Sequence, residues 1–139
     1  MARLRPYPVA AFCAVTLFIW TNRIWLAWTN DTDSVARKLV WSVPITAFVV
    51  AAVVIAGLML AGRADRTRWF APLVRAFAAG TVVFWAIRAP MIAFADHDVP
   101  FVVVHTVLAV ASVGTAVAAW RAVGDARTAP VEREPEPVR

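Results

Sequence analysis

The chain has 139 residues, of which 61% are hydrophobic and 17% are charged, and its mean hydropathy is +0.68. Soluble domains carry about 25% charged residues, so this composition excludes an ordinary soluble domain and indicates a small polytopic membrane protein. The formal net charge is +5, but the basic residues lie in loops and tails, so we expect no nucleic-acid partner, and the single Cys13 excludes a thiol–disulfide oxidoreductase.

Four apolar stretches are long enough to cross a bilayer core of about 30 Å at about 1.5 Å per residue. They cover residues 8–28, 40–61, 70–94 and 101–123. The second contains no charged residue and the fourth contains His105, whereas Arg23 interrupts the first and Arg88 the third. We therefore predict an all-α integral membrane protein with four transmembrane helices in an antiparallel up-down bundle, which forms one domain over residues 1–123.

The distribution of basic residues predicts the orientation of the bundle. Most of them lie before the first span, about the connection between the second and third spans, or about the end of the fourth span: Arg3, Arg5, Arg63, Arg66, Arg68, Arg75, Arg121 and Arg127. These three places share one side of the membrane, and basic loops mark the cytoplasmic side. We therefore expect both termini in the cytoplasm. The frequent use of arginine, alanine and valine is typical of GC-rich bacteria, so we expect the membrane to be the plasma membrane of a bacterial cell. Residues 124–139 contain too few apolar side chains to fold, which predicts a disordered cytoplasmic tail.

Spans one and three share a partial repeat at an offset of 65 residues. The offset pairs Phe12 with Phe77, Thr16 with Thr81, Trp20 with Trp85, and Arg23 with Arg88. Within each set the spacing is 4, 4 and 3 residues, which places all four members on one face of a helix. If the repeat is a duplication, its two units are parallel and related by a pseudo-twofold axis along the membrane normal.

The two arginines of this repeat are the most unusual residues of the spans. Both lie in the outer half of their helices, and because helical side chains lean toward the N-terminus, they start out pointed at the bilayer centre. Their exposure to lipid at that depth would cost about 1 to 3 kcal/mol each, so we expect both to face the bundle interior. Each follows a tryptophan by three residues, within reach of a cation–π contact. Snorkelling arginines within an aromatic interface belt are the alternative.

The polar residues near the outer side define a candidate ligand site and candidate ion pairs. The ligand site comprises Arg23, Arg88, His105, Asn22, Trp20 and Trp85. The structural ion pairs would use Asp31, Asp33, Asp96 and Asp98. An anionic headgroup, a quinone or a small anion would suit such a basic vestibule. Ion pairs that merely tie the hairpin ends together are the alternative.

The sequence contains no complete catalytic or metal-binding pattern. Asp96, His97 and Asp98 are adjacent in a tight turn, and adjacent residues seldom converge on one ion. A membrane haem usually needs axial ligands on two facing helices, and a serine hydrolase of the common type needs a Gly-x-Ser-x-Gly turn. No acidic residue lies inside a span, which disfavours proton-coupled cation export. We therefore expect no catalytic residue, metal or cofactor.

These observations favour a non-enzymatic structural or accessory component of the membrane. The alternative is a binding or transport module for an anionic ligand in an outward-facing vestibule. The expected partners are the lipid bilayer and other membrane proteins or a second copy of the chain. Small residues at a spacing of four would supply helix contacts, as in Ala76 with Gly80 and Ala111 with Thr115.

Overall fold

The computed structural model describes residues 6–29, 31 and 34–128. Its elements in chain order are α1 (Pro6–Thr29), α2 (Val35–Leu60), the short 3₁₀ helix η1 (Ala64–Arg66), α3 (Phe70–Ala93) and α4 (Val99–Thr128). The four long helices are each long and apolar enough to span a membrane. The predicted all-helical class with four potential spans is thereby confirmed. Asp33 and residues 129–139 of the expected tail lie outside the described residues.

Two helices extend beyond the spans expected from hydropathy. α2 begins at Val35, five residues before the expected start, because the hydroxyl of Ser34 caps it and accepts a hydrogen bond from the Arg37 backbone N–H at 3.4 Å. α4 continues to Thr128, past Gly124, where the tail was expected to begin. Extension of an existing helix adds one hydrogen bond per ordered residue, so less apolar flanks can remain helical.

The connection between α2 and α3 is shaped by a glycine. Gly62 adopts a left-handed φ of 63°, which residues with a Cβ rarely adopt. Its N–H donates to the Met59 carbonyl at 3.0 Å, and the Arg63 N–H donates to the Leu58 carbonyl at 2.9 Å. This paired Schellman arrangement satisfies the last carbonyls of α2 and turns the chain into η1.

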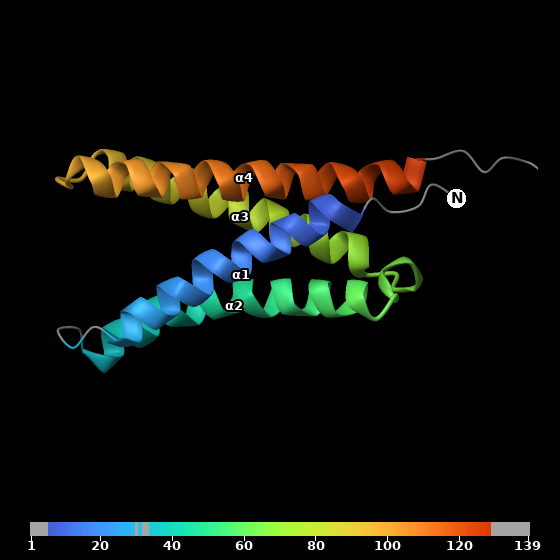
Figure 1. The fold of residues 1–139 in the computed structure, drawn as a ribbon, viewed down its shortest axis with the longest axis horizontal. Helices are drawn as coiled ribbons and strands as arrows, with labels where there is room; N and C mark the ends of the chain where they lie inside the picture. The colour runs from blue at the N-terminus through green and yellow to red at the C-terminus, as the bar shows by residue number, and fades with distance from the viewer. Residues whose placement is uncertain (1–5, 30, 32–33, 129–139) are drawn as a thin grey trace, which may run out of the picture.

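The helices form two hairpins, α1–α2 and α3–α4. The contact between α1 and α4 is the main one that joins the two hairpins. α1 packs along both α2 and α4, whereas α2 has few contacts with α3. Figure 1 shows α1 crossing between α2 and α4. We call the end that holds the start of α1, the α2–α3 connection and the end of α4 the basic end. At the opposite, divergent end the two hairpins stand apart (Figure 1).

The buried core lies toward the basic end and receives residues from all four long helices, including Ala52 and Ile55 of α2. Its fully or nearly fully buried members include Val9, Phe12, Cys13, Phe70, Val74, Ala116, Ala119 and Val123. The alanines of α4 have short side chains, which let the backbones of α1 and α4 approach closely. The core therefore holds the hairpins together at one end and leaves them free to separate at the other.

Candidate functional site

The repeated faces of α1 and α3 meet at the centre of the bundle. The rings of Phe12 and Phe77 lie 4.5 Å apart between centroids, and those of Trp20 and Trp85 lie 6.3 Å apart with an interplanar angle of 28°. Thr16 and Thr81, which lie between these pairs in sequence, are also buried. Phe48 of α2 and Phe84 of α3 complete an aromatic cluster around Trp20.

Contacts between residues related by the repeat are what a local twofold axis produces, because side chains beside such an axis meet their own equivalents. The axis would run between α1 and α3. The symmetry is not complete, however. It would make the α2–α3 contact equivalent to the α1–α4 contact, yet α1 and α4 pack extensively while α2 and α3 scarcely touch. The contact between α2 and α3, which includes Phe48 against Phe77 and Phe84, is therefore much smaller than its symmetry equivalent.

The arginines of the repeat lie where the hairpins separate. Arg23 follows Trp20 by one turn on the same face of α1. Trp20 is buried, with 6% of it exposed, but Arg23 is exposed. The bundle therefore does not enclose Arg23, contrary to the expected interior position. Arg88 on α3 is half-buried. Elsewhere in the bundle, Arg75 and Trp120 form a guanidinium–aromatic contact.

The expected polar partners of these arginines bond to their own helices. Asn22 donates from Nδ2 to the Phe18 carbonyl at 2.7 Å, and His105 Nδ1 lies 2.8 Å from the Phe101 carbonyl oxygen. The His105 ring also stacks on the Phe101 ring at 4.0 Å. These contacts satisfy polar groups within one helix, as the interior of a bilayer requires. The structure does not bring Asn22 and His105 together with the arginines through any contact among described side chains.

The expected ion pairs are not formed within the described residues. Asp31, Asp96 and Asp98 are exposed, and none pairs with a described side chain. No group of three potential metal ligands occurs among the described residues either. Asp31, Asp96 and Asp98 are therefore accessible in the isolated chain.

A buried donor without an acceptor lies inside the aromatic cluster. Trp85 is 4% exposed, and its Nε1 has no hydrogen-bond partner among the described residues. Trp28 provides the contrast, since its Nε1 donates to Ser42 Oγ at 3.1 Å across the α1–α2 hairpin. An unpaired buried donor costs about 1 to 3 kcal/mol, so Trp85 marks a position where a small acceptor would be stabilised.

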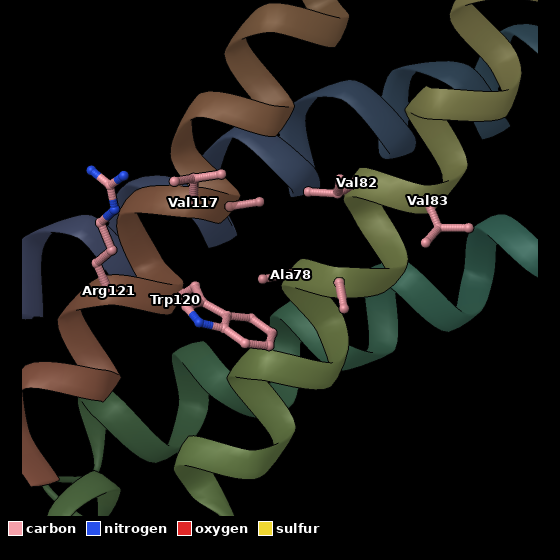
Figure 2. A pocket seen from close by; sticks show the side chains of 8 residues that line it. Ala78, Val82, Val83, Val117, Trp120 and Arg121 are labelled. Atoms are coloured by element: carbon pink, nitrogen blue, oxygen red, sulfur yellow. The ribbon is translucent and has the colours of Figure 1, made fainter.

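A second feature, near the basic end, was not expected from the sequence. An open groove of about 380 Å³ runs between α3 and α4. It is lined by Ala78, Ala79, Val82, Val83, Ala116, Val117, Trp120 and Arg121. Figure 2 shows the Trp120 indole extending from α4 toward α3, while the Arg121 guanidinium turns away from the indole. The groove exists because the side chains that line it on both helices are mostly small, and the Trp120 ring forms one of its boundaries.

Arg75 lies beside the end of this groove. Its guanidinium carbon is 5.5 Å from the centroid of the Trp120 ring. A Cβ added to Gly124 would lie 3.2 Å from Arg75 Nη2. The guanidinium of Arg75 therefore lies close to the α4 backbone at Gly124, where there is no side chain. Arg75 Nε is buried and has no acceptor among the described residues. The only contact that stabilises this cation in the described chain is therefore with the ring.

No family model, curated protein or solved structure matches this chain.

A signal for the groove was present in the sequence. On α3, Ala78 and Ala79 follow Arg75 by three and four residues, and Val82 follows Ala79 and Ala78 by three and four, so the four residues share one face; Trp120 precedes Gly124 by one turn on α4. In the sequence, Arg75 served only as one of the basic residues that predict the orientation. The contact between Arg75 and Trp120 depends on the register of α3 against α4, which no local pattern predicts.

Proposed function

We propose that this chain is a non-enzymatic structural or accessory component of the membrane that associates laterally with other transmembrane helices. The observation that carries the proposal is the position of its small residues. Gly80 of α3 and Gly114 of α4 are exposed, and a Cβ added to either would meet nothing within 4 Å. Ala76 and Ala111, which begin the two small-residue pairs, are exposed as well.

Exposed small residues in a membrane helix favour helix association. Lipid tails are as apolar as leucine, so helices associate through close packing, which glycine and alanine permit. On α4 the exposed face continues through Ala111, Gly114 and Ala118, at spacings that keep these residues in one stripe. The bundle itself uses the opposite, buried alanines for its internal contacts. The outer stripe is thus left available to a further helix.

Cysteine cross-linking in native membranes tests this association. In a Cys13→Ala background, Gly114→Cys and Ala118→Cys would be treated with a membrane-permeable bismaleimide. We expect a cross-linked product of higher mass from both. Ala116→Cys is the matched control, because Ala116 lies on the same helix but is 0% exposed. Cross-linking from Ala116→Cys alone, or no product from the two exposed positions, would contradict lateral association through α4.

The proposed orientation places the basic end in the cytoplasm. Arg63, Arg66 and Arg68 are all exposed in the α2–α3 connection, and an arginine excess in short loops marks the cytoplasmic side. Arg66→Cys, in the Cys13→Ala background, should resist an impermeant maleimide added to intact cells. Asp96→Cys, at the divergent end, should react with it. The reverse labelling pattern would overturn the orientation.

A second candidate function is the binding of a ligand with an acceptor oxygen at the divergent end. The unpaired Nε1 of Trp85 favours it, and Arg88 lies one turn farther along the same face. A quinone carbonyl or an anionic headgroup would accept a hydrogen bond there. A short-chain quinone should quench tryptophan fluorescence saturably in the native chain and more weakly in Arg88→Leu. Equal quenching of both proteins would remove this candidate.

A further inference from the structure

Arg75 at the basic end is a cation whose hydrogen-bonding capacity is unused in the described chain. A guanidinium offers five N–H donors, and an arginine next to a bilayer core normally reaches a carboxylate, a carbonyl or a phosphate. Here the guanidinium rests on the Trp120 ring, and its buried Nε lacks an acceptor. An anionic group placed beside Arg75 would supply acceptors to the part of the half-buried guanidinium that it can reach.

The groove, whose first lining residue on α3 is Ala78, three residues beyond Arg75, is apolar and of a volume that suits a hydrocarbon chain. Its volume of about 380 Å³ lies within the range of about 300 to 1,000 Å³ seen for small-molecule sites. From Arg75 to Val83 the helix rises about 12 Å, compared with about 15 Å for one leaflet, which is half of the core thickness. The groove itself, from Ala78 to Val83, rises about 7.5 Å, so it would follow about half of an acyl chain, and Arg75 lies one turn nearer the basic end.

We propose that the α3–α4 groove binds an anionic glycerophospholipid of the surrounding membrane, with its phosphate at Arg75 and one acyl chain along Ala79 and Val82. Trp120 lies between the two parts of the site, where an amphipathic ring suits the level of the headgroups. Arg121 is exposed at the rim, and together with the basic α2–α3 connection it adds positive potential around the phosphate.

The arrangement favours a lipid over the other occupants of such a surface. A soluble anion would interact with Arg75 but would leave the apolar lining facing hydrocarbon. A helix from a second copy would fill the groove but would bring no phosphate to the guanidinium. A zwitterionic lipid would carry its own cation beside Arg75. An anionic diacyl lipid matches both the charge and the apolar length, and this inference does not depend on the lateral association proposed above.

Native mass spectrometry of the full-length protein can measure this binding. The detergent-solubilised protein would be titrated with dioleoyl phosphatidylglycerol and, separately, with dioleoyl phosphatidylcholine. We expect one tightly bound phosphatidylglycerol per chain, with an apparent Kd about tenfold lower than for phosphatidylcholine, the ratio that corresponds to about 1.4 kcal/mol. Water-soluble glycerophosphate, which lacks acyl chains, should not compete at the same concentration.

Two variants with matched controls locate the site. Arg75→Gln removes the charge and should abolish the preference for phosphatidylglycerol, whereas Arg68→Gln, an exposed arginine at the same end, should keep it. Ala79→Phe fills the groove and should weaken both lipids about tenfold or more. Ala76→Phe is its control, because Ala76 is exposed on α3 but does not line the groove. If Arg75→Gln does not fold, the comparison of Ala79→Phe with Ala76→Phe still tests whether the lipid binds in the groove.

Several results would overturn the proposal. Equal affinity for the two lipids would eliminate the role of Arg75, and full competition by glycerophosphate would eliminate the role of the groove. Unchanged phosphatidylglycerol binding by Ala79→Phe would place the lipid elsewhere. A dimer that Ala79→Phe dissociates, with no change in bound lipid, would show that a second copy occupies the groove instead.

Discussion

Replacement of Phe12 by alanine tests the central packing most directly. Phe12 is 0% exposed, and its ring meets that of Phe77 at 4.5 Å between centroids. The two residues come from helices that face each other across the bundle, so the substitution removes a ring from its centre. Phe18 on the same helix is the control, since 68% of it is exposed.

The expected loss of stability differs from that in a soluble core. In water, Phe→Ala substitutions cost about 3 to 5 kcal/mol, which combines a transfer term with a cavity term. For helices that separate within a bilayer the transfer term nearly vanishes, because lipid is as apolar as the core. Removal of the ring vacates about 100 Å³, which at about 24 cal/mol per Å³ gives about 2.4 kcal/mol. The lost aromatic pair adds about 0.5 to 1.5 kcal/mol, so we expect Phe12→Ala to cost about 3 kcal/mol.

Reversible unfolding in mixed micelles, followed by tryptophan fluorescence, measures this loss because Trp20 and Trp85 lie in the same cluster. Phe18→Ala should change the free energy of unfolding by less than about 0.5 kcal/mol, as exposed positions do. Phe77→Ala alone should resemble Phe12→Ala. The double variant should cost about 1 kcal/mol less than the sum, because the same ring contact is lost only once.

Two outcomes would refute this reasoning. If Phe12→Ala and Phe18→Ala cost the same, the buried position of Phe12 has no energetic consequence in the membrane. If the effects of Phe12→Ala and Phe77→Ala are additive, the two rings are not in contact in the folded protein.

Three further substitutions address other parts of the structure. Ser42→Ala removes the acceptor of Trp28 Nε1, and thermal unfolding should show a loss of about 0.6 to 1.7 kcal/mol; no loss would mean that the hairpin does not use this bond. Gly62→Ala forces a Cβ into a left-handed φ of 63° and should cost about 1 to 2 kcal/mol, whereas Gly57→Ala, with open space around it, should stabilise α2 by up to about 1 kcal/mol. Trp85→Phe deletes an unpaired buried N–H, and chemical unfolding should show a change of less than about 1 kcal/mol, because relief of the donor offsets lost ring area; a larger loss would reveal an acceptor.

The number and approximate positions of the helices follow from the sequence because bilayer thickness sets a minimum apolar length. The helices nevertheless extend beyond the hydropathy spans at the start of α2 and at the end of α4. Both extensions contain charged residues, such as Arg37 and Lys38 in α2, but their backbone bonds continue the helix. Ser34 was the available signal for the start of α2, since serine is a strong N-cap residue.

The candidate sites were less accessible to sequence reasoning. The repeat indicated that Trp20 and Trp85 occupy equivalent faces, but not that these faces meet, because their contact depends on how the hairpins pack. The same spacing placed Arg23 on that face, and the separation of the hairpins leaves it exposed. Arg75 and Trp120 are 45 residues apart in the chain, so their contact is a product of tertiary register alone.

The pairing of α1 with α4 has a consequence for biogenesis. α1 is synthesised before α4, and the core residues Val9 and Ala116 are more than 100 residues apart. At about 5 to 20 residues per second, about 5 to 20 seconds separate their synthesis. During that interval the side of α1 that packs against α4 in the folded chain has another neighbour, such as lipid. The synthesis of α4 therefore completes the packing of α1.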